Sequence, residues 1–293
     1  MNNTVFNRLA FWKKRREGKV LGVYIAPDRV WVHQAAAEDQ AAVEMEFAIE
    51  GDWEDIFGKV AKEFGHASLR IVLAPHWYQL LPVDRPDGDD NEVANSLLWA
   101  VKDMVNIPVQ NLHLDFFDSC LPNQPKVSVV VMDKSELQKL VHGAIDSHLT
   151  IEGISIEELA MCHATPKNEQ AKLIISHYAG QDLLFTVIRD GGLCMHRRVR
   201  GFTDIHAISE QDLAYGAADN LSLELQRSMD YFESQLRQAP VSAVDILIDG
   251  ANEALAKLVG ANFNQPVSAV PHTSVGISFA DCAYQEWQQE EQA

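Results

Sequence analysis

Residues 20–34 read VLGVYIAPDRVWVHQ, and this stretch decides the fold. Its first seven residues are apolar, Pro27-Asp28 turns the chain, and the residues from Arg29 onward alternate between apolar and polar. Alternation with a period of two predicts half-buried strands, and residues 42–49, AVEMEFAI, show it again. Three such strands in succession predict an antiparallel meander.

A helix and a buried strand are predicted directly after the meander. Asp52 is the expected N-cap of the helix. Behind it, apolar side chains recur on one helical face: Trp53, Ile56, Phe57, Val60, Ala61 and Phe64. Residues 69–74, LRIVLA, predict the strand. The alternation of strands and helices favours the α/β class.

The meander-then-helix order occurs a second time, from Leu173 onward. Strands are predicted at residues 172–176, 183–189 and 193–200, followed by a long helix at 217–236, a strand at 245–248, a helix at 252–259 and a last strand at 276–279. Two copies of one order predict two lobes of similar construction.

A different pattern separates the two copies. Residues 84–91, DRPDGDDN, are a polar break before a predicted helix at 92–106, which Pro108 should end. Strands at 112–117 and 126–132 follow, and then a helix with Ser135 as its expected cap. We interpret this part as a small inserted α+β subdomain.

The predicted boundaries follow from these patterns. They are a basic N-terminal segment at 1–18, a first lobe at 19–81, the inserted subdomain at 82–150, a return to the first lobe at 151–170, and a second lobe at 171–293 in which 209–240 forms a reduced subdomain.

The charge of −18 is unevenly distributed. Residues 1–37 carry seven basic and two acidic residues, whereas the rest carries 17 basic and 40 acidic ones. An acidic body repels nucleic acid and attracts basic peptides. The basic start, with apolar residues between its charges, fits either contact with an anionic membrane face or a solvated terminus. No signal sequence or apolar run of roughly 18–20 residues is present, so we expect a cytoplasmic protein.

No catalytic or metal-binding pattern is evident. The four cysteines are far apart and form no C-x-x-C pair, and no hydrolase, zinc-protease or P-loop motif occurs. We therefore expect neither an enzyme nor a metal site.

Three stretches carry a resemblance to a known family. Residues 97–117, LLWAVKDMVNIPVQNLHLDFF, resemble the PilM-family helix that ends in an "IP" step before a strand. Residues 221–236, LSLELQRSMDYFESQL, resemble the PilM-family helix with the pattern E-φ-x-R-S-φ-x-Y-F. Residues 246–258, ILIDGANEALAKL, resemble the strand–glycine–helix that receives adenosine in actin-like ATPases.

The resemblance implies the two-lobed fold of the actin-like ATPase superfamily, and it covers the chain from about residue 19. It is closest to the shorter branch found in mannose-sensitive haemagglutinin (MSHA) pilus systems. PilM-like proteins bind ATP between their lobes. They also hold the cytoplasmic N-terminal peptide of an inner-membrane PilN-type protein beside the inserted subdomain and couple it to the pilus motor ATPase. The resemblance therefore implies a PilN-like partner, a motor ATPase as a further partner, and a place at the inner membrane.

This sequence departs from the family at the first phosphate turn. The superfamily uses one D-x-G turn per lobe, in which aspartate holds Mg²⁺ or its water and glycine lets backbone N–H groups approach phosphate. The pattern G-φ-D-φ-G falls on residues 22–26, GVYIA. Gly22 is kept, but Tyr24 stands at the aspartate and Ala26 at the second glycine.

The second phosphate turn departs in the same way. The pattern φ-D-φ-G falls on residues 175–178, where Ser176 replaces the aspartate and Tyr178 the glycine. Asp249 and Gly250 form the strand–glycine step of the adenosine region, which carries little weight alone. We therefore expect a degenerate nucleotide site without Mg-ATP hydrolysis or a required cofactor.

Aromatic side chains near the insert are candidates for partner contact. Trp77 and Tyr78 follow a strand end and fit core positions as well as partner binding. Trp99 lies on the polar face of its predicted helix, either as a contact anchor or covered by the same fold. The basic run 196–200, HRRVR, fits either a grip on an acidic group or a solvent-facing strand.

Two alternatives remain open. The first is an active actin-like ATPase with divergent phosphate turns, which Mg-dependent nucleotide binding would identify. The second is the cytoplasmic part of a GspL-type secretion component, which shares the fold and usually continues into a transmembrane helix. The sequence shows no such helix; this would favour the pilus scaffold in a complete chain and would not discriminate in a truncated one.

Overall fold

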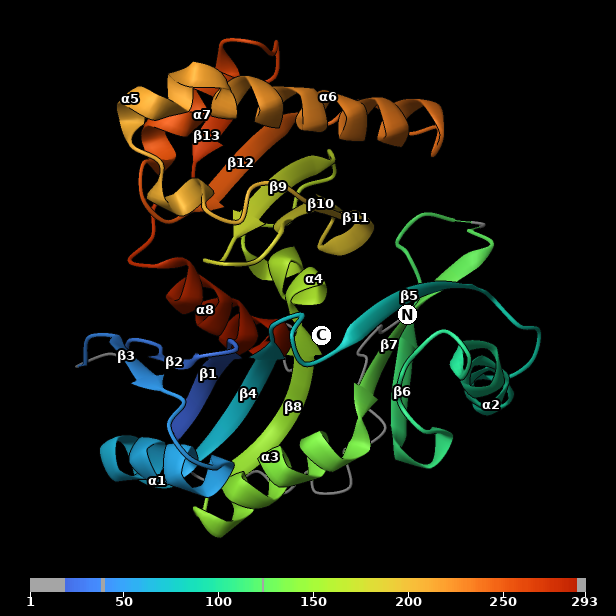
Figure 1. Cartoon of the computed structure of the whole chain (residues 1–293), viewed down its shortest axis with the longest axis vertical. Coiled ribbons are helices and arrows are strands. Elements are labelled where there is room, and N and C mark those ends of the chain that lie inside the picture. Colours follow the sequence, from blue (N-terminus) through green and yellow to red (C-terminus); the bar gives the residue numbers. More distant parts are fainter. Residues whose placement is uncertain (1–18, 38–39, 123, 289–293) are drawn as a thin grey trace. The chain divides into compact units, whose positions relative to one another are not determined.

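The computed structural model describes residues 19–37, 40–122 and 124–288, so the predicted basic segment at 1–18 lies outside the described residues (Figure 1). The chain divides into two compact units. The first runs to Ala160 and resumes at Phe279, and the second is Met161–Ser278. No described helix is both long enough and apolar enough to cross a membrane.

The first unit is built on a five-stranded sheet in the order β3-β2-β1-β4-β8. The meander pairs antiparallel, and β1, β4 and β8 run parallel. The bounds are β1 (Lys19–Ile25), β2 (Arg29–Gln34), β3 (Val43–Ala48), β4 (Ala67–Leu73) and β8 (Thr150–Ile156). The predicted meander and the strand after it are confirmed.

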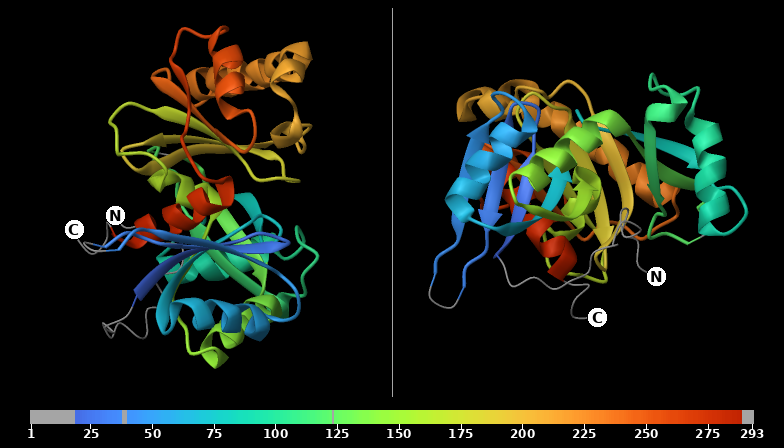
Figure 2. Two further views of the ribbon diagram at one scale, coloured as in Figure 1. Left: turned by 90° about the vertical axis from the view of Figure 1, so that its left-hand side faces the viewer. Right: turned by 90° about the horizontal axis from the view of Figure 1, so that it is seen from below.

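Helices cover both faces of this sheet (Figure 2, left view). On one face lie α1 (Trp53–Phe64) and α3 (Lys134–Asp146), and on the other lies α8 (Val275–Gln288). Asp52 caps α1 as predicted, since its side chain accepts a hydrogen bond from the Asp55 backbone. The α1–α3 contact is close, because a Cβ on Gly143 would lie 2.6 Å from that of Trp53.

The insert is a three-stranded antiparallel sheet, β5-β7-β6, with a helix on one face. Its elements are β5 (Gln79–Asp84), α2 (Asp90–Val101), a 3-10 turn (Val109–Asn111), β6 (Leu112–Phe117) and β7 (Lys126–Asp133). Val93, Leu97 and Val101 of α2 pack on the valines of β7 and form a core of their own. The predicted α+β insert is therefore present. Its edge strand β5 was not predicted, because proline at position 82 argues against a strand in the sequence pattern.

The second unit repeats the meander in a five-stranded sheet ordered β11-β10-β9-β12-β13. Helices α6 and α7 cover one face (Figure 1). The bounds are β9 (Lys172–His177), β10 (Leu183–Arg189), β11 (Gly192–Val199), β12 (Ala243–Ile248), β13 (Val267–Ala269), α6 (Ala218–Ser234) and α7 (Asn252–Gly260). Short turns lead into α6: Ile205–Ala207, α5 (Glu210–Asp212) and a π-helical turn at Leu213–Ala217. A further short helix, α4 (Glu157–Ala160), and a 3-10 turn (Met161–His163) join the units.

Three predicted elements differ from the structure. The helix expected to reach residue 106 ends at Val101, its last buried side chain, and Met104 beyond it is exposed. The cap of α3 is Asp133 rather than Ser135, because the Asp133 carboxylate accepts from the Ser135 backbone at 2.8 Å. The strand predicted at 276–279 is part of helix α8.

Three domain boundaries also differ from the prediction. The predicted return to the first lobe at 151–170 is too long, because the second unit begins at Met161. Residues from Phe279 onward belong to the first unit rather than the second lobe, because α8 packs on β1. Helix α3 packs on α1 and β8 of the first unit as well as on β7, so it does not belong to the insert alone. Residues 276–279 alternate between small or polar and apolar side chains, which predicted a short strand. In the structure, helical spacing instead brings Phe279, Ala280 and Ala283 to one buried face.

Candidate functional site

In the first predicted phosphate turn, residues 22–26, the central position is a buried tyrosine, Tyr24. Tyr24, on β1, has no exposed surface. Its ring stacks on Phe279 of α8 with centroids 4.8 Å apart, and its hydroxyl donates to Glu157 Oε1 at 2.5 Å. At the position where the sequence pattern predicted an aspartate to be replaced, the phenol of Tyr24 is thus a hydrogen-bond donor to the Glu157 carboxylate of α4.

Gly22 lies on the same face of β1 as Tyr24, and Ala26 directly follows the strand. A Cβ on Gly22 would lie 1.9 Å from the carbonyl oxygen of Ala280 in α8. The Ala26 N–H donates to the Arg29 carbonyl at 2.9 Å, which closes the turn between β1 and β2. Gly22 is therefore required by helix packing in this structure.

The second predicted phosphate turn ends β9 and holds a pair of stacked histidines. Ser176 is buried, and its hydroxyl has no hydrogen-bond partner among the described residues. His177 Nε2 lies 3.1 Å from the Gln181 carbonyl, and its ring stacks on His206 with centroids 5.5 Å apart. Tyr178 is also largely buried. This turn therefore carries bulky, buried side chains and no acidic residue at positions 176–178.

Asp249 and Gly250 follow strand β12 as predicted, and both make contacts within the second unit. Asp249 accepts from the Val275 backbone at 3.0 Å and lies 3.3 Å from His272 Nε2. This carboxylate raises the pKa of His272. Gly250 has φ +86°, and a Cβ there would lie 2.2 Å from the His206 carbonyl oxygen. The backbone of His206 thus occupies the space directly above the glycine.

Burial lowers the pKa of His177 to about 4, with the neighbouring His206 as the second cause. The folded state therefore favours neutral imidazole, and stability is complete above pH 6.5, the value expected in the unfolded chain. We predict that stability falls as the pH drops from 6.5 to 4, by about 3 kcal/mol at most for this group. Urea unfolding at several pH values would measure the slope.

His177→Gln should flatten that slope, and the same change at exposed His142 should leave it unaltered. Part of the slope should remain in His177→Gln, because burial also lowers the pKa of His163 to about 4. An unchanged slope in His177→Gln would contradict the assignment.

Of the three aromatic residues predicted to bind a partner, Trp99 is the exposed one. Its side chain is 65% exposed on α2, with Lys102 Nζ 4.7 Å from the ring centroid. Tyr78 is buried and donates to Glu158 Oε2 at 2.5 Å. Trp77 is half-buried, with its ring centroid 5.4 Å from that of Trp53. Tyr78 is therefore part of the first unit's interior.

Glu157 and Glu158, which pattern reasoning missed, are both almost completely buried. They follow the apolar end of β8, and two adjacent acids at such a position were the available signal. Their phenol partners, Tyr24 and Tyr78, come from different parts of the first unit.

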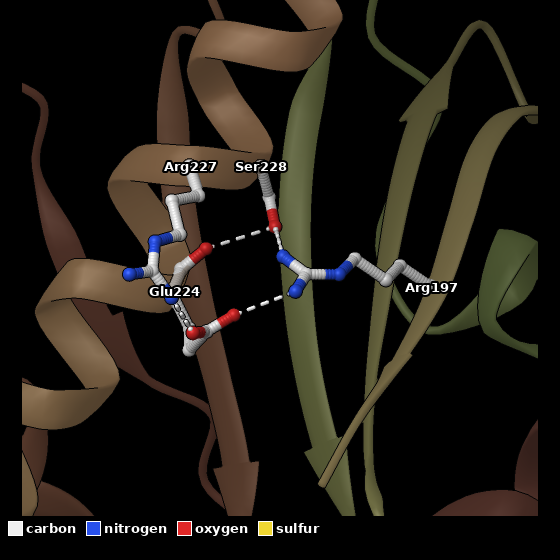
Figure 3. Close-up of polar contacts among 4 residues, drawn as sticks. All are labelled: Arg197, Glu224, Arg227 and Ser228. Carbon is white, nitrogen blue, oxygen red and sulfur yellow. Dashed lines mark hydrogen bonds and ion pairs between the residues drawn. The ribbon is translucent and has the colours of Figure 1, made fainter.

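The E-x-x-R-S motif of α6 ties that helix to the sheet (Figure 3). Arg197 of β11 donates to Glu224 Oε2 at 2.6 Å and to Ser228 Oγ at 3.0 Å. Arg227 donates to the other oxygen of Glu224. Of the basic run predicted at 196–200, Arg197 thus binds within the second unit, and the motif residues are explained by packing.

No group of three or more histidine, cysteine, aspartate or glutamate side chains is placed to hold a metal ion within the described part of the chain.

The fold is similar to those of several solved structures. A structure of the PilM–PilN type IV pilus biogenesis complex matches with a TM-score of 0.65 at 13% identity, over 93% of this chain and 99% of that one. The cytoplasmic domain of EpsL, an inner-membrane component of the type II secretion system of Vibrio cholerae, matches with a TM-score of 0.56 at 16% identity, over 91% and 94% of the two chains.

A protein of unknown function from Bacteroides thetaiotaomicron, described as having the actin-like ATPase fold, matches with a TM-score of 0.50 at 11% identity, over 90% of this chain and 96% of that one. No protein-family model matches the sequence, and no curated protein is significantly similar to it. At these identities the likeness establishes the fold. The chain has the actin-like ATPase fold that the repeated meander predicted.

Proposed function

We propose that this protein is a non-catalytic cytoplasmic scaffold of a type IV pilus assembly machine. It binds the cytoplasmic N-terminal peptide of an inner-membrane PilN-like protein and so lies at the inner face of that membrane. The finer assignment is to the MSHA branch, in the position of MshI. The pilus motor ATPase is a further expected partner, and the basic start of the chain is a candidate for peripheral membrane contact.

The hydrogen bond from Tyr24 to Glu157 is the main support for a non-catalytic role. Protein sites for Mg²⁺ usually supply one or two carboxylates, whereas the phenol of Tyr24 donates its hydrogen to Glu157. In the second unit, Ser176 offers no charge, and the His206 backbone lies against Gly250. These substitutions support a pseudo-ATPase that needs neither ATP nor Mg²⁺.

The peptide-binding part of the proposal rests on likeness and on surface chemistry. The solved structure with the TM-score of 0.65 is of a PilM–PilN complex. The charge of −18 would attract a basic peptide tail, and exposed Trp99 on the insert offers an apolar anchor. Anchors of this kind carry most of the affinity of small interfaces.

Isothermal titration calorimetry tests both parts with one preparation. We expect heat from the N-terminal peptide of the neighbouring PilN-like protein and none from Mg-ATP. Micromolar binding of Mg-ATP would overturn the pseudo-ATPase proposal and favour an active ATPase with divergent turns.

Trp99→Ala should weaken peptide binding by about tenfold or more, as expected for loss of an interface anchor. Ile145→Ala is the matched control, because Ile145 is also an exposed apolar residue, 56% exposed, but lies on α3. Equal affinity of wild type and Trp99→Ala would remove Trp99 from the interface. In cells, the same variant should reduce surface MSHA-type pili.

A second candidate function follows from the likeness to the EpsL cytoplasmic domain. A GspL-type secretion component would share the fold and would also lack a sound nucleotide site. In that case the PilN-like peptide should give no heat, and the purified N-terminal domain of a type II secretion motor ATPase should bind instead.

A further inference from the structure

Helix α8 begins in the second unit and continues in the first. Its bounds are Val275–Gln288, and the division between the units falls inside it, after Ser278. The contacts that the second unit makes with the first turn of α8 therefore act on a helix that the first unit packs against β1. The proposed function leaves these contacts unused.

Two caps hold the first turn of α8. Ser274 precedes the helix, and its hydroxyl accepts a hydrogen bond from the Ile277 backbone at 3.2 Å, as a local N-cap does. Asp249, at the end of β12, accepts from the Val275 backbone at 3.0 Å. The Val275 N–H is one of the first amides of the helix, which have no acceptor inside it. The second cap is therefore supplied from a distant part of the chain.

Asp249 also faces His272, whose ring lies between two acceptors. Its Nε2 lies 3.3 Å from Asp249 Oδ1, and its Nδ1 lies 2.8 Å from the Val270 carbonyl oxygen. Asn252 donates to the same carbonyl at 3.2 Å. A neutral imidazole has one N–H and one lone pair, so the ring can donate to both oxygens only when both nitrogens are protonated. This geometry therefore fits a charged His272.

The surroundings of His272 also favour the charged ring. Its side chain is 10% exposed, and the hydrogen bond to Asp249 raises its pKa although burial opposes the charge. Asp249 is the charged group that faces the ring, since neither β13 nor residues 275–278 contain a charged residue. His177, on which Asp249 acts weakly, and His206, which stacks on His177, are the other titratable groups of this region.

Loss of one ring proton would set a lone pair against an oxygen. If Nδ1 keeps its hydrogen, Nε2 faces the Asp249 carboxylate, and if Nε2 keeps its hydrogen, Nδ1 faces the Val270 carbonyl. The connection from Asp249 through His272 to Val270 is therefore broken in both tautomers. Asp249 then loses the contact that positions it against Val275, whereas the Ser274 cap does not depend on this charge.

We propose that His272 and Asp249 form a pH-dependent latch on the first turn of α8. When His272 is protonated, the latch holds Asp249 in place to cap Val275. When His272 is neutral, the latch is released and the Ser274 cap remains. The inference goes beyond the proposed function, because it gives the second unit a means of holding or releasing the start of a helix that the first unit binds.

The direction of the pH effect follows from the raised pKa of His272. The contribution of the latch to stability is complete below pH 6.5 and is lost as the pH rises through the pKa of the folded protein. The contribution of His177 has the opposite sign, because it is lost on acidification from pH 6.5 to 4. The two histidines can therefore be told apart by the direction of the pH change.

An NMR titration of the histidine rings tests the charge of His272. In protein labelled with ¹⁵N at histidine, the His272 ring is the signal that disappears in His272→Gln. We expect its pKa to lie above 6.5 in wild type and to fall in Asp249→Asn, which keeps an acceptor for Val275 but removes the charge. A pKa of His272 at or below 6.5 in wild type would overturn the proposal.

Amide hydrogen exchange tests the latch on two amides of one helical turn. As the pH rises from about 6 to about 9, the Val275 amide should lose protection, after correction for the intrinsic exchange rate at each pH. The loss should be about tenfold for each unit by which the pKa of His272 exceeds 6.5. The Ile277 amide should lose less, because its Ser274 cap is retained. Constant protection of Val275 over this range would contradict the latch.

Two variants locate the effect, and one serves as control. His272→Gln and Asp249→Asn should each give a Val275 protection that no longer changes with pH. His142→Gln, at an exposed position of α3 in the first unit, should keep the wild-type profile. Amides of β9 report any general loss of stability in the same spectra. A pH dependence of Val275 that persists in both latch variants would also overturn the proposal.

Discussion

Gly22→Ala is expected to destabilise the first unit by about 3 kcal/mol or more, at or beyond the upper range for overpacked cores. The added methyl group would lie 1.9 Å from the carbonyl oxygen of Ala280 and 2.8 Å from the backbone nitrogen of Tyr284. Both are backbone atoms of α8, so relief requires the whole helix to move away from β1. Thermal denaturation followed by circular dichroism would measure the loss.

Gly58→Ala is the matched control for this variant. Gly58 lies inside α1, and nothing lies within 4 Å of a Cβ placed there. Alanine in an unobstructed helical position should stabilise the protein by about 0.5–1 kcal/mol. Hydrogen exchange should show lost protection in β1 and α8 for Gly22→Ala alone. An unchanged melting temperature in Gly22→Ala would contradict the packing of α8 on β1.

Arg70→Met is expected to destabilise the first unit by about 3 kcal/mol, the lower end for breaking a buried ion pair, because the Glu152 side chain is 33% exposed and water can solvate it in the variant. Arg70 is 2% exposed in the centre of β4. Its Nε donates to Glu152 Oε2 at 2.8 Å, and its Nη1 donates to the Tyr284 carbonyl of α8 at 2.8 Å. Methionine fills part of the space but leaves both acceptors without this donor. Urea unfolding would measure the difference.

The exposed pair of Arg29 and Glu46 provides the comparison. The two side chains are 2.8 Å apart but 43% and 47% exposed. Arg29→Met should therefore cost about 1 kcal/mol or less, as is usual for surface ion pairs. Similar losses for the two arginine variants would show that burial does not control the contribution of Arg70.

The residues of the candidate site could be named from the sequence, but their contacts could not. That Tyr24 and Ser176 stand where the resemblance expects aspartate stays a prediction. The partner of Tyr24 could not be named, because Glu157 is 133 residues away along the chain. The same holds for the basic run on β11, whose Arg197 meets Glu224 of α6 only after the sheet and helix have packed.

The sequence by itself determined the two meanders, the helices beside them and the insert, since these depend on the local period of apolar residues. The tertiary structure decided the place of α8. Residues 276–279 alternate like a strand, but helical spacing buries Phe279, Ala280 and Ala283 together. Gly22 leaves room for that helix on the first sheet. Short apolar segments fit either period, and burial against a distant strand selects between them.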